Sequence, residues 1–352
     1  MIDAIVKEIG LAALSPQDAA HASPPLGETC ETLYFGGGTP SILNIADLKL
    51  IFDALKKRFV FADDMEITLE ANPDDITAKK LSAWRSIGIN RLSTGIQSFM
   101  EEELKWMNRA HTADESLQCI DLIHEAGFTN FSVDLIYGSP LLSDENWKKN
   151  LDLVIQKNIP HISCYALTVE PKTALDKMIA LRKSAPVDTE KQARQFVMLM
   201  HRMEAAGYEH YEISNFSKPG MRSRHNSSYW QGQYYYGFGP SAHSFDGCSR
   251  NWNISNNAVY IQSIQKGIIP FEKETLTATQ KLNEYIMTSL RTNEGLDLDW
   301  VSRKFGEAFK KRLEVTGEKW KEGGKLLWID SKLVLTGEGK LFADGIASDL
   351  FF

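Results

Sequence analysis

Between residues 32 and 169, short apolar stretches typical of strands alternate with longer amphipathic stretches typical of helices. The expected strands cover residues 32–38, 66–72, 91–97, 131–138 and 162–169, and the expected helices cover 46–59, 77–86, 100–126 and 145–157. Strands that alternate with helices form parallel sheets covered by helices. Five strands are too few for a closed eight-stranded barrel, so we expect an α/β fold with an open, partial barrel.

An amphipathic helix over residues 2–14 precedes the first expected strand. A βα-repeat begins with a strand, so this helix has no strand before it. We therefore expect that the barrel lacks its first strand in this chain, and that this strand lies upstream of Met1.

Polar residues lie where the expected strands end. They are Thr39, Glu70, Asn72, Gln97, Ser98, Asp134, Thr168 and Glu170. In open α/β folds, ligands bind at the carboxyl ends of the strands. Each residue alone is typical of a turn, but the set as a whole predicts a binding site on this rim.

Three glycines, Gly36 to Gly38, directly follow the first strand in the sequence YFGGGTPS. Such a run is either a tight strand-to-helix turn or a cradle whose backbone N–H groups face an anionic or zwitterionic ligand. It is neither a Walker A loop nor a G-x-G-x-x-G dinucleotide fingerprint.

Composition excludes several classes of protein. A net charge of −7 argues against nucleic-acid binding, which needs a basic face. No apolar run is long enough to span a membrane, and no signal peptide opens the chain. The spacing of Cys30, Cys119, Cys164 and Cys248 fits neither a zinc site nor a disulfide framework. We therefore expect reduced thiols in a cytoplasmic protein.

Several motifs in a fixed order carry a family resemblance. They are YFGGGTPS, EANPDD, RLSTGIQSF, NRAHT, DLIYG, EISNFS, HNSSYW and GFGPSAHS, between residues 34 and 244. With these motifs the chain resembles the radical S-adenosylmethionine (SAM) proteins of the oxygen-independent coproporphyrinogen III oxidase family, and within it the heme-chaperone branch. The resemblance implies a partial (β/α)6 barrel and a smaller α+β C-terminal domain. We place the domains at residues 1–245 and 246–352.

The resemblance also implies a SAM site on the rim. Gly36, Gly37, Gly38 and Thr39 would cradle the methionine end of SAM, and Glu70 matches a SAM-contacting glutamate. Gln97, Arg109 and Asp134 match positions that contact a second SAM in the oxidase. His243 falls where the oxidase has an apolar residue near SAM.

One family motif is absent from the sequence. The C-x-x-x-C-x-x-C run, whose three thiolates bind a [4Fe–4S] cluster, would precede the first helix and does not occur in this chain. We expect the missing cysteines and the missing strand to share one cause, a truncation upstream of Met1. The alternative is a natural relative without the cluster.

The segment HNSSYW distinguishes two functions. In the heme-chaperone branch, His225, Asn226, Tyr229 and Trp230 match the proposed heme-binding element, with His225 as candidate iron ligand and Asn226 orienting its ring. The structural alternative is a packed aromatic turn. The resemblance favours a heme chaperone with heme and a heme-accepting protein as partners. The alternative function is the oxidase itself, an enzyme that decarboxylates coproporphyrinogen III with the cluster and SAM.

The sequence changes character from about residue 276. Two helices interrupted at residues 293–295, a third polar helix, two short strands and a closing helix are expected there. Helices followed by a hairpin resemble a winged helix, but the segment lacks a basic recognition face. We expect a lid or docking surface over the open side of the barrel.

Overall fold

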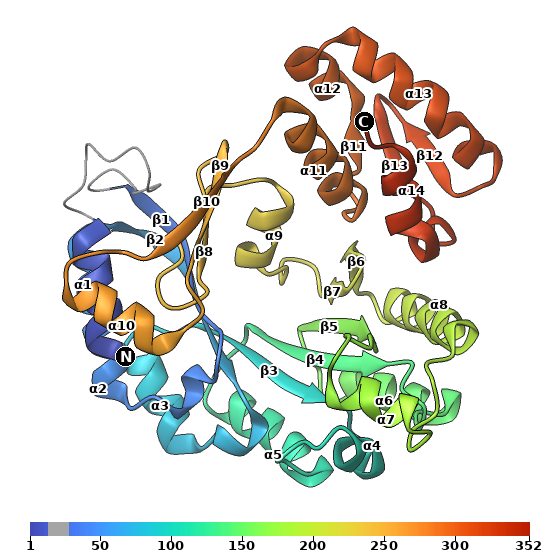
Figure 1. The fold of residues 1–352 in the computed structure, drawn as a ribbon. Helices are drawn as coiled ribbons and strands as arrows, with labels where there is room; N and C mark the ends of the chain where they lie inside the picture. Colours follow the sequence, from blue (N-terminus) through green and yellow to red (C-terminus); the bar gives the residue numbers. More distant parts are fainter. Residues whose placement is uncertain (13–27) are drawn as a thin grey trace.

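The chain is organised around a seven-stranded sheet that curls into a half-barrel (Figure 1). The computed structural model describes residues 1–12 and 28–352. The strand order is β1-β2-β3-β4-β5-β7-β6; β1 to β5 are parallel to one another, and β7 is antiparallel to both of its neighbours, β5 and β6. The strands are β1 (Thr29–Phe35), β2 (Val60–Ala71), β3 (Arg91–Gln97), β4 (Phe131–Tyr137), β5 (His161–Ala166), β6 (Glu209–Glu212) and β7 (Asn215–Ser217). The five parallel strands confirm the expected open α/β barrel, whereas the closing β6–β7 pair was not expected.

Helices cover the outer face of this sheet (Figure 1). They are α2 (Ile45–Arg58), α3 (Ala78–Ser86), α4 (Glu101–Trp106), α5 (Ala113–Glu125), α6 (Asp144–Gln156), α7 (Ala174–Ala180) and α8 (Thr189–Ala205). The apolar faces of α2, α3, α5, α6 and α8 and the outward side chains of the strands form the main core, which includes the fully buried Leu48, Leu92, Ile120 and Trp147, whereas α7 has no buried residue. Short 3-10 turns η1 (Pro40–Ile42) and η2 (Pro73–Asp75) follow β1 and β2.

The single helix expected over residues 100–126 is wrong, because α4 and α5 are separate helices. Asn108 takes a left-handed backbone conformation with φ of 53°, which ends the first helix. Thr112 then caps the second helix and forms a capping box with Glu115. The break turns the chain so that Arg109, which lies between the two helices, reaches the rim.

The first helix, α1 (Ile2–Ala12), packs against α2 and α10 (Asn257–Gln265). Its expected last two residues lie outside the described residues. Glu8 is buried on this helix and accepts hydrogen bonds from the Gly239 N–H, the Asn253 amide and the Tyr260 hydroxyl. Burial raises the pKa of this carboxyl. The helix is therefore fixed to a second, smaller sheet.

That smaller sheet is antiparallel, in the order β10-β9-β8, and was not expected. Its strands are β8 (His243–Phe245), β9 (Ser249–Asn253) and β10 (Phe271–Thr275), and α9 (Arg224–Trp230) precedes them. The boundary proposed at residue 245 falls between β8 and β9 of this sheet. The division into two domains stays a prediction.

The C-terminal part has its own core around Leu282, Ile286, Leu313 and Leu326. It comprises α11 (Ala278–Leu290), β11 (Leu296–Asp297), α12 (Leu298–Phe305), α13 (Glu307–Glu322), β12 (Leu326–Ile329), β13 (Lys332–Leu335), η3 (Gly339–Phe342) and α14 (Ala343–Asp349). The helices and the hairpin follow the expected order, and β11 adds a third strand beside β13. Among the described residues, no helix is both long and apolar enough to cross a membrane.

Candidate functional site

The glycine run lies directly after β1 in a conformation that needs glycine at each position. Gly37 and Gly38 have φ of 71° and 65°, in the left-handed region. A Cβ at Gly36 would lie 2.6 Å from the Tyr34 ring and 3.0 Å from a carboxylate oxygen of Glu70. In this loop the backbone therefore passes close to the side chains of Tyr34 and Glu70, and Thr39 ends the loop.

Glu70, at the end of β2, is aimed at this loop. One carboxylate oxygen accepts a hydrogen bond from the Tyr34 hydroxyl at 2.7 Å, and the other accepts one from the Gly37 N–H at 3.3 Å. The glutamate and the glycine run, 33 residues apart, form one cradle. Its open side carries exposed backbone and a partly buried carboxylate, which fits the polar groups of a nucleoside or an amino acid.

Arg109 joins the rim next to Glu70. Its Nη2 donates to the Gly95 carbonyl at 3.2 Å and lies 3.5 Å from the Asn72 side-chain oxygen. Gln97, with a left-handed φ of 68°, closes the same corner, because its amide lies 2.9 Å from where a Gly95 Cβ would be. Within the described part of the chain, the buried Arg109 Nε has no hydrogen-bond partner, so the guanidinium keeps donor capacity for a ligand.

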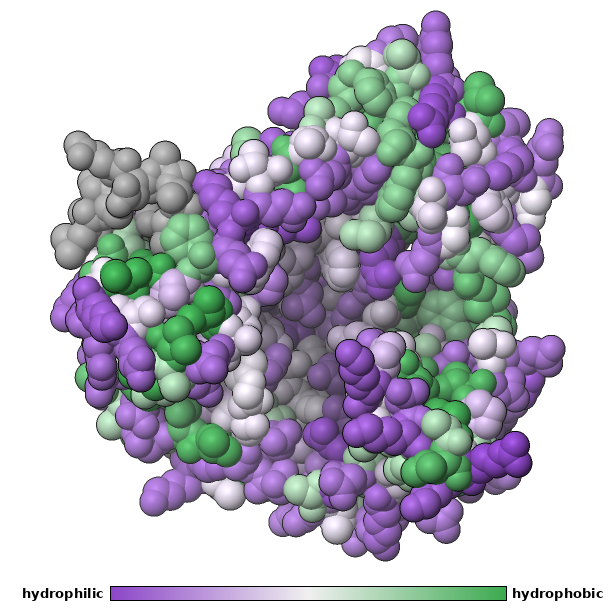
Figure 2. Space-filling model, in the orientation of Figure 1, coloured by the Kyte–Doolittle hydropathy of each residue, from purple (hydrophilic) through white to green (hydrophobic). Residues whose placement is uncertain are grey.

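Asp134 points into the barrel from β4. Burial raises the pKa of this carboxyl to about 6, and the Glu70 charge adds to the rise. A hydrogen bond with Ser163 and the charges of Arg91 and Arg109 act in the opposite direction. The structure thus brings Glu70, Asp134 and Arg109 together at one end of the barrel. Figure 2 shows that this face of the molecule is hollowed at its centre.

His225 lies on α9, with its partly buried ring held on three sides. Its Nδ1 is 2.8 Å from Thr32 Oγ1, and its Nε2 is 3.0 Å from the Tyr229 hydroxyl. The Tyr34 ring stacks on it, with centroids 4.8 Å apart and planes at 20°. Burial, aided by the charge of Arg91, lowers the pKa of His225 to about 4. The imidazole is therefore neutral at physiological pH.

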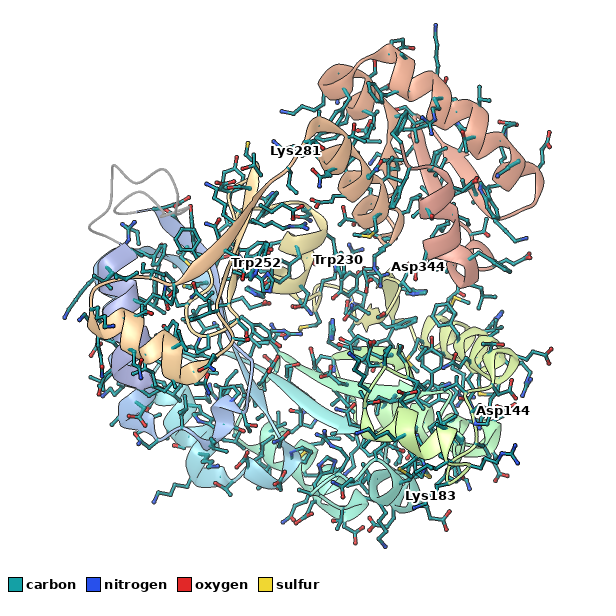
Figure 3. The ribbon with its side chains drawn as sticks, viewed as in Figure 1. Asp144, Lys183, Trp230, Trp252, Lys281 and Asp344 are labelled. Atoms are coloured by element: carbon teal, nitrogen blue, oxygen red, sulfur yellow. The ribbon has the colours of Figure 1, made fainter. Side chains whose placement is uncertain are left out.

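Two aromatic residues of the HNSSYW motif make different contacts. The Tyr229 ring meets the His225 ring edge-on, with centroids 5.1 Å apart, whereas the Trp230 ring lies 5.1 Å from the guanidinium of Arg291. The ring-orienting contact expected from Asn226 is made by Thr32 instead. Figure 3 shows Trp230 on α9, facing the C-terminal part.

His243 lies on a different element from the residues around His225. It begins β8, is exposed, and stacks on Trp252 with centroids 6.1 Å apart. Its expected role in SAM binding stays a prediction.

The sequence interpretation missed four residues of the barrel interior: Thr32, Tyr34, Glu66 and Arg91. A signal for some of them existed, since Glu66, Thr68 and Glu70 alternate with apolar residues along β2. Alternation of this kind indicates a strand with one polar face. The alternation along β2 therefore indicates that the face of this strand toward the barrel interior is polar.

The cysteines are not brought together. Burial raises the pKa of Cys30 to about 11 and that of Cys119 to about 12, Cys164 is fully buried, and Cys248 is exposed. No group of three or more histidine, cysteine or acidic side chains that could hold a metal ion occurs among residues 1–12 and 28–352. The thiols of this chain do not fit a three-cysteine cluster site.

Family models and solved structures that resemble this chain agree on its class of protein. The sequence profile of the radical SAM superfamily matches residues 13–154, and that of the HemN C-terminal domain matches residues 276–342. The solved structure of the coproporphyrinogen III oxidase HemN from Escherichia coli has a TM-score of 0.82 and 23% identity, and the match covers 99% of this chain and 82% of that one. The two family matches define a radical SAM protein with a HemN-type C-terminal domain, and the solved HemN structure shares its fold.

The curated relatives narrow this class. The heme chaperone HemW of Mycobacterium tuberculosis is 33% identical over 323 residues, 92% of this chain and 81% of the relative. The heme chaperone HemW of Bacillus subtilis is 31% identical over 318 residues, 90% of this chain and 84% of the relative. The chain belongs to the HemW heme chaperone family.

Proposed function

We propose that this chain binds heme at α9, with His225 as the iron ligand, and passes it to an accepting protein. The observation that carries the proposal is the state of the His225 ring. It is neutral, partly buried and flanked by the rings of Tyr34 and Tyr229. A neutral imidazole is a common axial ligand of heme iron, and aromatic rings suit an apolar macrocycle.

The contacts of the ring are compatible with ligation. To bind iron through Nε2, the His225 imidazole must carry its proton on Nδ1, which would then donate to Thr32 Oγ1. In that tautomer the Tyr229 hydroxyl donates to Nε2. Iron and the hydroxyl then compete for the same lone pair, so Tyr229 must turn away when heme binds.

Replacing Tyr229 by phenylalanine should therefore strengthen hemin binding. One competing hydrogen bond contributes roughly 0.5–1.5 kcal/mol, so the affinity should rise by about two- to tenfold. Titration of hemin followed at the Soret band measures this. Tyr235→Phe is the matched control, because the Tyr235 ring packs on Tyr229 with centroids 4.8 Å apart, whereas the described contacts of the His225 ring are with Thr32, Tyr34 and Tyr229. Weaker binding by Tyr229→Phe would mean that the hydroxyl holds the heme instead.

Hemin binding should also resist mild acid. Because the pKa of His225 is lowered to about 4, the ring stays neutral until the pH approaches that value. An ordinary histidine of pKa ~6.5 would lose about tenfold in affinity by pH ~5.5, whereas we expect a change of less than about twofold between pH ~8 and ~5.5. The same titration on His225→Ala corrects for the titration of hemin itself. A tenfold loss that disappears in His225→Ala would show an ordinary, exposed histidine.

We also propose that the rim binds SAM. Gly36 to Gly38 and Thr39 would hold its methionine end, and Glu70 its ribose hydroxyls. Arg109, Gln97 and Asp134, which match contacts of a second SAM, would extend the site along the same rim. Support comes from the cradle, which a Cβ at Gly36 would fill, and from the unpartnered Nε of Arg109 in the described structure. When bound, SAM would supply an adenosyl group. The four thiols of this chain do not fit a [4Fe–4S] cluster, so the proposal concerns SAM binding alone.

Glu70→Ala should weaken SAM binding by about one to two decades, because a charged hydrogen bond contributes roughly 1.5–3 kcal/mol. Calorimetry with SAM measures the change. Glu102→Ala, which removes an exposed carboxylate from α4, is the control. Equal affinity of Glu70→Ala and the native chain would make the rim assignment wrong.

The oxidase activity has no separate support, since the likeness to HemN at 23% identity concerns the fold. The proposed function is tested by two assays on the same preparation. We expect a Soret band that saturates with hemin and no decarboxylation of coproporphyrinogen III under anaerobic reducing conditions. Decarboxylation without hemin binding would overturn the proposal.

A further inference from the structure

A buried carboxylate from the barrel fixes the start of α9. Glu66 lies in the middle of β2 and is only 4% exposed. One of its oxygens accepts the His225 N–H at 2.9 Å, and the other accepts the Arg224 N–H at 3.1 Å. The first N–H groups of a helix have no partner within the helix. Glu66 accepts two of them, and the N-cap residue Ser223 accepts the Asn226 N–H, so both residues fix where α9 begins.

The carboxylate is itself held from inside the sheet. Arg91, 1% exposed on β3, forms an ion pair with Glu66, in which its Nε lies 3.8 Å from the carboxylate and so beyond hydrogen-bond distance, and its Nη2 donates to Ser132. From Ser132 the contacts continue to His161 Nδ1 at 2.9 Å, and from His161 Nε2 to the Tyr211 hydroxyl at 2.7 Å. A buried charge needs such partners. The charge of Arg91 therefore offsets the buried charge of Glu66, whose two oxygens accept the N–H groups of α9.

A second contact to α9 is weaker. The Arg224 guanidinium pairs with Asp64 at 2.9 Å, but the Asp64 side chain is 81% exposed. Exposed ion pairs contribute little. Of the two acidic groups of β2 that reach α9, only Glu66 contacts the backbone of His225 itself.

We infer that Glu66 is a positioning residue for the heme ligand: its carboxylate, held by Arg91, sets the place of the His225 ring between Thr32 and Tyr34. The inference rests on the proposed function, because the position of His225 matters to heme only if His225 binds iron. It adds a residue of the barrel interior, 159 positions away in the chain, to the heme site.

The first test needs no heme. In Glu66→Gln, one oxygen remains an acceptor and the other becomes an amide donor, so at least one of the two N–H groups loses its partner. Amide hydrogen exchange of Arg224 and His225, followed by NMR on protein labelled with ¹⁵N-arginine and ¹⁵N-histidine, should accelerate at least about tenfold at one of them. Asp64→Asn should leave both rates unchanged. Unchanged rates in Glu66→Gln would overturn the inference.

Loss of the Glu66 charge leaves Arg91 unpaired and can unfold the protein. The double variant Glu66→Gln/Arg91→Met removes both charges and carries the same test. Glu103→Gln, which alters a carboxyl that is 1% exposed on α4, controls for general effects of changing a buried acid.

The second test uses hemin as the probe. The double variant should bind hemin at least about fivefold more weakly, and adding His225→Ala to it should give the affinity of His225→Ala alone, because both changes act through one ligand. Faster exchange with unchanged hemin affinity, while His225→Ala weakens binding, would overturn the inference and leave the proposed function intact. Unchanged hemin binding by His225→Ala would overturn the proposed function, and the inference with it.

Discussion

Hemin binding by His225→Ala should be at least about tenfold weaker than in the native chain, a loss of about 1.4 kcal/mol or more. The reason is that alanine removes the imidazole that is neutral, oriented by Thr32 and covered by Tyr34. The aromatic rings around it remain, so some binding through apolar contact should persist. The Soret maximum should shift, because the iron loses its nitrogen ligand.

One other histidine serves as a control for this experiment, and another tests for a second iron ligand. His201→Ala changes an exposed ring on α8 and should leave both affinity and spectrum unchanged. His243→Ala tests whether a second imidazole shares the iron. An unchanged spectrum in His225→Ala, His243→Ala and their combination would leave HNSSYW as a packed aromatic turn.

Arg291→Ala should lower the free energy of unfolding by about 3–5 kcal/mol, because it strips a buried carboxylate of its charged partner. Arg291 lies just after α11, and both its Nε and its Nη2 lie 2.9 Å from an oxygen of Glu212, which is fully buried at the end of β6. The backbone carbonyl of Arg291 also accepts a hydrogen bond from the Ile213 N–H. The same residue covers Trp230, so the C-terminal part is joined to both the half-barrel and α9.

Chemical denaturation measures this loss. The matched control is Arg222→Ala, since Arg222 bridges Glu209 and Glu294 at the same junction but both carboxylates are about 40–50% exposed. We expect the control to cost less than about 1 kcal/mol. An equal loss of unfolding free energy in the two variants would contradict the prediction that the buried Glu212 makes the Arg291 ion pair the stronger one.

The half-barrel was predictable from the sequence because its signals are local. Runs such as that of β4 (Phe131–Tyr137) are apolar, short and bounded by helices with recognisable caps. The glycine run and Glu70 were predictable as rim residues, because the carboxyl ends of parallel strands meet at one edge. Their direct contact through the Gly37 N–H was not predicted from the sequence.

The environment of His225 was not predictable, because its partners are distant in the chain. Thr32 and Glu66 lie 193 and 159 residues away, and their contacts depend on how α9 docks on β1 and β2. For the same reason the lowered pKa of His225, about 4, was not predictable from the sequence. The sheet β8–β9–β10 was missed because its strands are short and rich in polar residues, as in SRNWN.

The most direct test of the account is electron–nuclear double resonance on the ferric heme complex of protein labelled with ¹⁵N-histidine. It detects a histidine nitrogen bound to the iron irrespective of affinity. We predict a ¹⁵N coupling in the native chain that persists in His243→Ala and disappears in His225→Ala. A coupling that survives in His225→Ala, or the absence of any histidine coupling in the native chain, would contradict His225 as the heme ligand.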